Sequence, residues 1–125
     1  MSAFAALQIL VVDDHEMMRS VLSRALRAAG ATQIRTAENG SQALALLAAQ
    51  PADLVISDYS MPEMDGLEFI RRLRADARHA QARVVMLTGH MNTETAAHQA
   101  GADVVLTKPV TPENLLIALE ALLGR

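Results

Sequence analysis

The sequence predicts an α/β domain in which a parallel sheet carries helices on both faces. Five short apolar segments alternate along the 125 residues with segments whose apolar residues recur at helical spacing. The apolar segments are nearly continuous, which is typical of strands buried on both faces. The connections are short, and strict strand–helix alternation implies right-handed crossovers. A chain of this length is expected to form one domain.

The first predicted strand covers residues 7–12 and precedes a helix whose apolar stripe extends from Met18 to Ala29. Gly30 is placed to end this helix, because glycine readily takes the left-handed conformation found after helix ends. Residues 33–37 have mixed polarity. They are therefore predicted to form a strand at the edge of the sheet.

The second helix is predicted over residues 43–48, with Ser41 as its N-cap and Pro51 beyond its end. Residues 54–56 form the third predicted strand, which stops in front of Asp58. The helix that follows has an apolar stripe formed by Leu67, Ile70 and Leu73. On its other face and just beyond it, we expect a solvated surface of arginines: Arg71, Arg72, Arg74 and Arg78.

The fourth predicted strand covers residues 83–87, and Asn92 is predicted to cap a short helix that Gly101 ends. This helix is rich in Thr and other polar residues, so its intrinsic helix propensity is low. Residues 103–106 form the fifth predicted strand. Thr111 then provides an N-cap for the last helix, with a proline at its first position.

The composition excludes several classes of function. The chain has no Cys, which rules out disulfides, thiol catalysis and cysteine zinc sites and fits a reducing compartment. The net charge is −3 without a basic segment, so binding to nucleic acid through its phosphates is not expected. No apolar run reaches the length of a membrane span. We therefore expect a cytoplasmic protein that contacts neither membranes nor nucleic acid directly.

Polar side chains stand where four of the five predicted strands end. Asp13 and Asp14 follow the first strand, Asp58 the third, Thr88 the fourth and Lys108 the fifth. In open α/β sheets, ligands bind at the carboxyl ends of the strands. Each residue alone could be a helix cap, a turn residue or a surface group, but their joint occurrence at equivalent positions indicates one shared site.

The chemistry of these groups indicates a site for a metal ion and a phosphoryl group. Three carboxylates within about 5 Å would repel one another by about 3 kcal/mol per pair at an effective dielectric constant near 20. An all-oxygen ligand set favours Mg²⁺, which prefers one or two carboxylates together with a phosphate oxygen. Lys108 would supply a compensating positive charge and Thr88 a hydroxyl donor. Asp58 is then the predicted acceptor of the phosphoryl group.

Four motifs carry a family resemblance: Asp13-Asp14, the run from Asp58 to Gly66 with its Met-Pro-Glu-Met-Asp-Gly ending, Leu87-Thr88-Gly89 and Lys108-Pro109. In these motifs and their spacing, the chain resembles the receiver domains of response regulators in two-component signalling. The resemblance implies a doubly wound, flavodoxin-like sheet of order 2-1-3-4-5 with five helices. It also implies a single receiver domain over residues 1–125 with no output domain in this chain.

The resemblance implies a role for each motif residue. Asp58 would take a phosphoryl group from a phosphohistidine on a sensor histidine kinase or a histidine phosphotransfer protein. Asp14, Asp58 and the backbone carbonyl of Ser60 would ligate Mg²⁺, with Mn²⁺ as an alternative ion, and Asp13 would help to position it. Thr88 and Lys108 would bind the phosphoryl oxygens. The Lys108–Pro109 bond is expected to be cis.

The resemblance also implies how the site is tuned and how it signals. Ser60 and His90 occupy positions that modulate dephosphorylation in this family. Many receivers carry an aromatic residue three positions before the lysine, where its ring moves inward as the threonine shifts. This chain has Val105 there, which puts a ring-swinging switch in doubt. The other histidines have no metal-ligand spacing and are expected to have local polar roles.

The last predicted helix carries more apolar residues than one buried face requires. Phosphorylation would shift the face formed by the fourth helix, fifth strand and fifth helix and so control a partner. The surplus apolar surface suggests that this face contacts a downstream protein or forms a homodimer. The identity of that target does not follow from the sequence.

Three other interpretations of the sequence compete with this one. A phosphatase of the haloacid-dehalogenase type would need Asp-x-Asp after the first strand, whereas here His15 stands two residues after Asp13. A flavin-binding protein would need a phosphate cradle where residues 13–16 are acidic. The chain could also be the receiver of a larger DNA-binding or enzymatic regulator. As a receiver it would phosphorylate and dephosphorylate itself rather than turn over external substrates.

Overall fold

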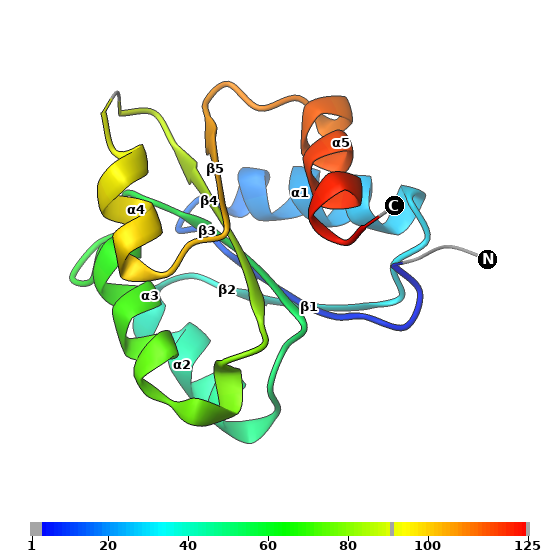
Figure 1. Ribbon diagram of the computed structural model, residues 1–125. Helices are drawn as coiled ribbons and strands as arrows, with labels where there is room; N and C mark the ends of the chain where they lie inside the picture. Colours follow the sequence, from blue (N-terminus) through cyan, green and yellow to red (C-terminus); the bar gives the residue numbers. More distant parts are fainter. Residues whose placement is uncertain (1–3, 91, 125) are drawn as a thin grey trace.

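The computed structural model describes residues 4–90 and 92–124, and these form one five-stranded parallel sheet between two layers of helices (Figure 1). The strand order is β2-β1-β3-β4-β5, which confirms the prediction, including the edge position of β2. The strands and helices have these bounds: β1 Gln8–Val12, α1 Glu16–Ala28, β2 Gln33–Ala37, α2 Gly40–Ala49, β3 Leu54–Asp58, α3 Gly66–Ala75, the 3-10 helix η1 Ala77–His79, β4 Arg83–Thr88, α4 Glu94–Ala100, β5 Val104–Thr107 and α5 Pro112–Leu122.

Alternating residues of the central strands point into two separate cores. Val55 belongs to the core beneath α2, α3 and α4, whereas its neighbours Leu54 and Ile56 belong to the core beneath α1 and α5. All five residues of β3 are buried, which accounts for the continuous apolar run in the sequence. The strand therefore reaches Asp58 with both of its faces covered.

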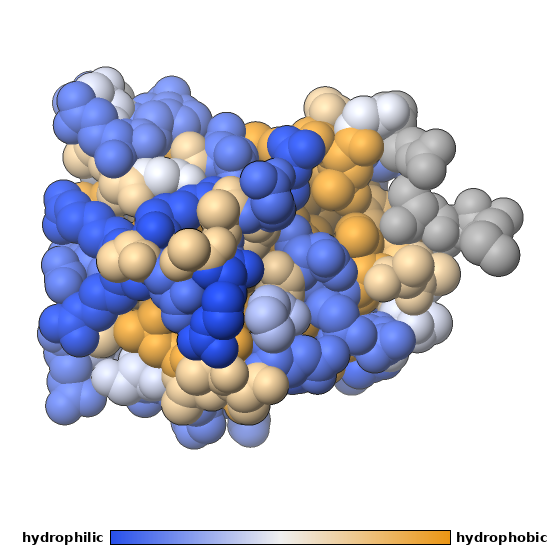
Figure 2. Space-filling model, turned by 60° about the horizontal axis from the view of Figure 1, so that its bottom comes forward, coloured by the Kyte–Doolittle hydropathy of each residue, from blue (hydrophilic) through white to orange (hydrophobic). Residues whose placement is uncertain are grey.

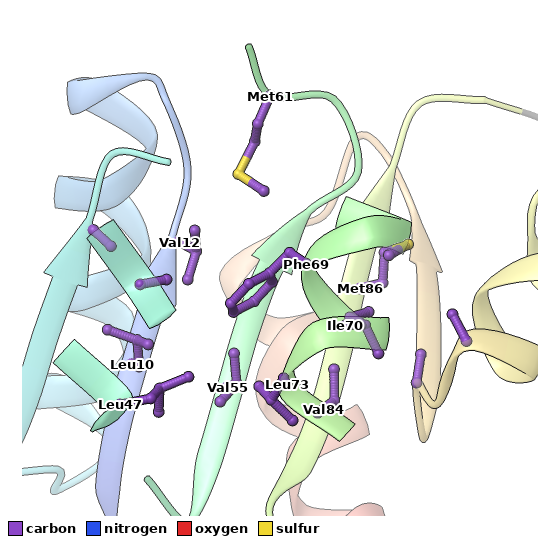
Figure 3. Packing of buried hydrophobic residues seen from close by; sticks show 14 of the residues in the cluster. Leu10, Val12, Leu47, Val55, Met61, Phe69, Ile70, Leu73, Val84 and Met86 are labelled. Carbon is purple, nitrogen blue, oxygen red and sulfur yellow. The ribbon is translucent and has the colours of Figure 1, made fainter. Parts of the chain in front are cut away.

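The core beneath α2, α3 and α4 is mainly aliphatic, and Phe69 is its largest fully buried side chain (Figure 3). Met61 and Met64, from the loop after β3, also contribute to it. Methionine fills irregular gaps well because its side chain is long and unbranched. The loop that follows Asp58 is thus fixed by burial of its own side chains.

Two predicted helix caps are wrong. Asn39, rather than Ser41, caps α2, because its side chain accepts a hydrogen bond from the Gln42 N–H while its own backbone is extended. Asn92 does not cap α4 either. Its φ is 65°, in the left-handed region that asparagine tolerates, and Thr93 takes the N-cap position. The sequence shows which residues can cap, but the path of the incoming loop selects among them.

The predicted solvated face of arginines is correct for Arg71 and Arg72, which are exposed on α3, and wrong for Arg74. Only 21 % of the Arg74 side chain is exposed, and its guanidinium donates to the carbonyls of Gly101 and His79. It also pairs with Asp103 at 3.1 Å. Arg74 therefore ties α3 to the C-terminal end of α4.

The surface differs between the two helical layers. In the view of Figure 2, apolar side chains gather on the side that carries α1 and α5. On α5, Leu115 and Leu119 are buried while 64 % of Ile117 is exposed. Among the described residues, none of the helices is both long enough and apolar enough to span a membrane.

Gly66, the first residue of α3, lies against the end of β3. A Cβ atom at this position would stand 2.5 Å from the Asp58 carbonyl oxygen and 3.0 Å from the Tyr59 Cα. Backbone atoms cannot move away as easily as the end of a side chain. Gly66 therefore lets α3 begin directly beside Asp58.

We predict that Gly66→Ala destabilises the protein by about 1–3 kcal/mol, because the added methyl group overpacks a backbone contact. Equilibrium unfolding in urea measures this change. Gly89→Ala is the matched control, since a Cβ at Gly89 meets nothing within 4 Å, and it should change stability by less than about 0.5 kcal/mol. Equal stability of the two variants would contradict the prediction.

Candidate functional site

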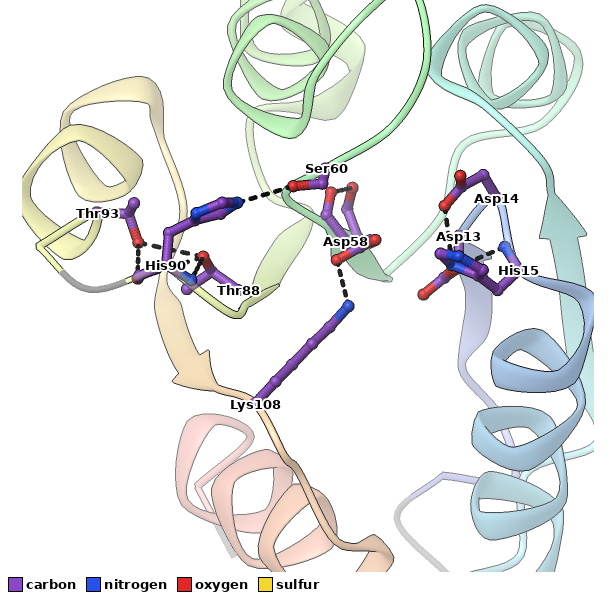
Figure 4. Close-up of polar contacts among 10 residues, drawn as sticks. Asp13, Asp14, His15, Asp58, Ser60, Thr88, His90, Thr93 and Lys108 are labelled. Atoms are coloured by element: carbon purple, nitrogen blue, oxygen red, sulfur yellow. Dashed lines mark hydrogen bonds and ion pairs between the residues drawn. The ribbon is translucent and has the colours of Figure 1, made fainter.

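The carboxyl ends of four strands bring the predicted site residues to one edge of the sheet (Figure 4). Asp13 and Asp14 follow β1, Asp58 ends β3, Thr88 ends β4 and Lys108 follows β5. The parallel pairings place β3 between β1 and β4. Asp58 therefore lies between the acidic pair on one side and the loops after β4 and β5 on the other.

Three carboxylates and one imidazole form a compact cluster. Asp13, Asp14, His15 and Asp58 each offer a ligand atom, and these atoms all lie within 4.8 Å of one another. Asp13 is fully buried and Asp58 is 3 % exposed. Burial raises the pKa of the Asp13 carboxyl above its usual range, and the nearby Asp58 charge raises it further. The cluster thus holds negative charge that the protein solvates poorly.

Local hydrogen bonds fix the turn that carries Asp13. Its Oδ1 accepts from the His15 N–H at 2.9 Å, and its carbonyl accepts from the Arg19 guanidinium at 2.8 Å. Asp13 N–H donates to the Ala37 carbonyl and so extends the pairing with β2. The first turn of α1 begins immediately afterwards, at Glu16. These contacts hold the side chain of Asp13 toward Asp58.

His15 belongs to the cluster, although it was expected to have only a local polar role. Its Nδ1 lies 3.2 Å from Asp13 Oδ1 and 3.1 Å from Asp14 Oδ1. The side chain is 71 % exposed. The spacing of the four histidines in the sequence gives no hint of this position. The direct succession of His15 after two acids at a strand end was the available signal.

Lys108 provides the positive charge of the site. Its Nζ lies 2.7 Å from Asp58 Oδ1, and its backbone N–H donates to the Thr88 carbonyl at 2.7 Å. The Lys108–Pro109 peptide bond is cis, as predicted. The Lys108 side chain is 28 % exposed, while the Asp58 side chain is almost fully buried. The ion pair therefore closes the site from the side of β5.

The loops after β3 and β4 meet on the other side of Asp58. Ser60 Oγ and His90 Nε2 lie 3.1 Å apart, and the rings of Tyr59 and His90 are 5.2 Å apart. Thr88 is 1 % exposed, and its hydroxyl accepts from the His90 N–H at 3.0 Å. In the part of the chain that is described, every hydrogen bond of the Thr88 hydroxyl stays within its own loop and the start of α4.

Val105 lies on β5 opposite Met86 and packs against the core beneath α2, α3 and α4. A branched aliphatic side chain at this position has no ring to rotate toward the site. The structure therefore offers no aromatic ring at this position for a ring-swinging switch.

The donor atoms of the acidic cluster fit a divalent cation. Asp13 Oδ2 and Asp14 Oδ1 are buried without a hydrogen bond, which is costly for carboxylate oxygens unless a cation is bound. An open groove of about 450 Å³ adjoins them, and its lining residues are Asp14, His15, Tyr59, Ser60, Met61, Pro62 and Asp65. A hydrated ion can therefore approach the carboxylates from solvent.

Sequence comparison identifies relatives of this chain. The family model described as the response regulator receiver domain matches residues 9–120. A Rhizobium etli protein named "Probable chemotaxis protein CheY" is 39 % identical, with 99 % of this chain and 98 % of the relative covered. The chemotaxis protein CheY1 of Helicobacter pylori is 34 % identical, with 94 % of this chain and 98 % of the relative covered.

Structure comparison agrees with this assignment. The chemotaxis response regulator CheY4 of Vibrio cholerae superposes with a TM-score of 0.85 at 34 % identity, covering 91 % of this chain and 96 % of that one. The receiver domain of a histidine kinase from Syntrophus aciditrophicus gives a TM-score of 0.86 at 31 % identity, with 95 % and 91 % covered. The chain belongs to the receiver domains of response regulators and is a CheY-like member of that family.

Proposed function

We propose that the chain acts as one receiver domain in which Asp58 accepts a phosphoryl group. The observation that carries this proposal is the position of the Asp58 carboxyl, buried between the acidic pair and the Lys108 ammonium. A carboxylate oxygen of Asp58 would attack phosphorus while the bond from phosphorus to the donor nitrogen breaks. The donor imidazole keeps the bonding electron pair, and an acyl phosphate forms on Asp58.

The carboxylates of Asp14 and Asp58 and the backbone carbonyl of Ser60 would hold Mg²⁺, with Asp13 positioning it. Mn²⁺ also prefers oxygen ligands and is the expected substitute. When bound, the ion supplies positive charge that neutralises the transferring phosphoryl group. The unpaired oxygens of Asp13 and Asp14 support this assignment. Lys108 adds a second positive charge at Asp58, and Thr88 offers a hydroxyl to a phosphoryl oxygen.

The partner that fits this chemistry is a protein carrying a phosphohistidine, either a sensor histidine kinase or a histidine phosphotransfer protein, in the cytoplasm. Met17 on α1 is 79 % exposed and Val21 is 43 % exposed, so this helix offers apolar contacts to a donor. Ser60 and His90 join two loops above Asp58. This contact supports a role for Ser60 and His90 in setting the lifetime of the phosphoryl group. The rate at which phosphorylated variants of these two residues hydrolyse measures that lifetime.

We assign the coupling between the site and α4 to Thr93. Its hydroxyl donates to the His90 carbonyl at 3.1 Å and lies 3.4 Å from the Thr88 hydroxyl. If Thr88 turns toward a phosphoryl oxygen, Thr93 loses this neighbour. The opposite end of α4 is held by the bonds from Arg74 to the Gly101 carbonyl. Phosphorylation would therefore move the N-terminal end of α4 about a fixed C-terminal end.

Two properties of α4 support this motion. Only Ala97 and Ala100 of this helix are buried, so few apolar contacts resist a shift. α4 packs against β5, and β5 also contacts α5, where Ile117 is 64 % exposed. This face is the proposed contact surface for a downstream protein. A homodimer through the same face stays a prediction, which sedimentation of phosphorylated and unphosphorylated protein tests.

The phosphoacceptor assignment predicts that acetyl phosphate and Mg²⁺ add one phosphoryl group to the wild-type protein and none to Asp58→Asn. The amide cannot act as the nucleophile at this position. Intact-mass spectrometry measures the product. Asp76→Asn is the matched control, because Asp76 lies between α3 and η1, outside the acidic cluster, and its carboxylate pairs with Arg78. This variant should be labelled normally. Phosphorylation of Asp58→Asn at the wild-type level would refute the assignment.

Asp13→Asn should stabilise the metal-free protein at neutral pH. The raised pKa of Asp13 means that folding favours its protonated form, so the folded state loses stability as pH rises from the ordinary carboxyl value of 3.8 through the pKa in the folded protein. Asparagine keeps an oxygen that can accept the His15 N–H but carries no charge. Thermal unfolding in EDTA measures the gain, which should shrink as the pH approaches 4.

The same variant should lose its stabilisation by Mg²⁺. At a concentration ten times the Kd, a ligand that binds only the folded protein contributes about 1.4 kcal/mol to the wild type. Asp13→Asn should gain much less at that concentration. A variant that is less stable than wild type in EDTA would show that Asp13 is not held against other negative charge. A variant that Mg²⁺ stabilises as much as wild type would show that Asp13 does not help to hold the ion.

The coupling through Thr93 predicts different effects for two substitutions. Thr93→Val removes the hydroxyl and should shift the amide resonances of residues 94–100 before phosphorylation and reduce their further change afterwards. Thr93→Ser keeps the hydroxyl and should behave as wild type. Both variants should be phosphorylated on Asp58 to the wild-type extent. An unchanged response of α4 in Thr93→Val would exclude this route.

A further inference from the structure

The exposed large apolar side chains lie on one helical layer of the molecule. Among the described residues they are Met17 and Val21 on α1 and Ile117 on α5. These two helices pack against each other on the same face of the sheet (Figures 1 and 2). Within residues 4–90 and 92–124, α2, α3 and α4 carry no large apolar side chain that is exposed. The outer faces of α1 and α5 are therefore the apolar part of the described surface.

The exposed residues of α1 form a stripe along its outer face. Leu22 and Leu26 are buried on the inner face. Met17, Val21 and Arg24 are exposed and follow one another at intervals of four and three residues. Residues at this spacing lie on the same side of a helix. The stripe on α1 thus combines apolar and basic side chains.

α5 has a corresponding stripe of opposite charge. Leu115 and Leu119 are buried on its inner face. Glu113, Ile117 and Glu120 are exposed, again at intervals of four and three residues. The outer face of α5 therefore combines an apolar side chain with two acids. Together, the outer faces of these two helices form what we call the α1–α5 surface.

The charges of the α1–α5 surface are not neutralised within the chain. Arg24 and Arg27 are exposed on α1, as are Glu113 and Glu120 on α5. None of the ion pairs or side-chain hydrogen bonds among the described residues involves any of these four. Glu16, at the start of α1, leaves this helix net basic, because Arg19 adds a third positive charge. The surface therefore has a basic half and an acidic half.

We propose that the α1–α5 surface binds the same surface of a second copy of this chain, with α1 of each copy packed on α5 of the other. Such a pair has two-fold symmetry, so every contact occurs twice. The apolar stripes then cover each other, and the arginines of α1 face the glutamates of α5. A partner of uniform charge would meet like charge on one of the two helices. The two-signed surface therefore fits its own copy best.

The pairing is expected to be weak. α1 has 13 residues and α5 has 11, so the helices are about 20 and 17 Å long and form a contact at the small end of specific interfaces. Exposed ion pairs add little affinity and mainly fix the orientation of the two copies. Sedimentation velocity of the full chain from about 10 to 500 µM covers micromolar dissociation constants and should show a dimer that grows with concentration. Pairing requires no phosphorylation, so this test is independent of the proposed function.

A charge exchange between the two helices tests the contact directly. Arg24→Glu with Arg27→Glu makes both halves of the surface acidic, and Glu113→Arg with Glu120→Arg makes both halves basic. Each double variant alone should dimerise at least about tenfold more weakly than wild type, because like charges then meet. An equal mixture of the two should associate about as tightly as wild type, since every α1–α5 contact again joins opposite charges.

Arg71→Glu with Arg72→Glu is the matched control. It changes the net charge by the same amount, but these exposed arginines lie on α3, in the other helical layer, and it should dimerise as wild type does. Thermal unfolding verifies that each variant is folded before mixing. A wild-type protein that stays monomeric at every concentration would overturn the proposal. So would a mixture that associates no more tightly than its components, or a control that is weakened as much as the charge-reversed variants.

Discussion

The concentration of negative charge at one end of the sheet is the constraint on which the rest of the structure depends. Asp13 and Asp58 are buried side by side, and burial together with their mutual repulsion raises the pKa of Asp13. Lys108, at 2.7 Å from Asp58, offsets part of this charge. The unpaired oxygens of Asp13 and Asp14 show that the compensation is incomplete. An acidic site of this kind can hold a cation, whose charge would offset the remaining negative charge of the carboxylates.

The scaffold holds these charges in place by packing rather than by bonds among the acids. β3 is covered on both faces, and Gly66 lets α3 begin beside Asp58 without a Cβ in the way. The loop between them is fixed by Met61 and Met64 in the core. On the other side of the site, α4 buries only two alanines, and Arg74 holds its C-terminal end. One side of the site is therefore anchored by extensive burial, whereas α4, on the other side, contributes little buried apolar surface.

Residues outside the familiar motifs give this receiver its individual character. Val105 removes the aromatic ring through which many relatives are expected to signal, and the hydroxyl of Thr93 lies between the site and α4 instead. His15 adds an imidazole nitrogen to a cluster that otherwise offers oxygen ligands. Neither residue stood out in the sequence. Thr93 is one of several threonines in a polar stretch, and His15 is one of four histidines without metal-ligand spacing.

The sequence by itself determined the fold class, the strand boundaries to within a few residues and the gathering of Asp13, Asp14, Asp58, Thr88 and Lys108 at one edge. These features follow from local patterns, because a buried strand needs a continuous apolar run and parallel strands end at the same edge. The tertiary structure alone decided the features that depend on contacts between distant segments. Arg74 became a link because Gly101 and Asp103 fold against it, and Asn39 became a cap because of the direction in which the chain leaves β2. The orientation of His15 toward two carboxylates depends likewise on how the chain turns from β1 into α1.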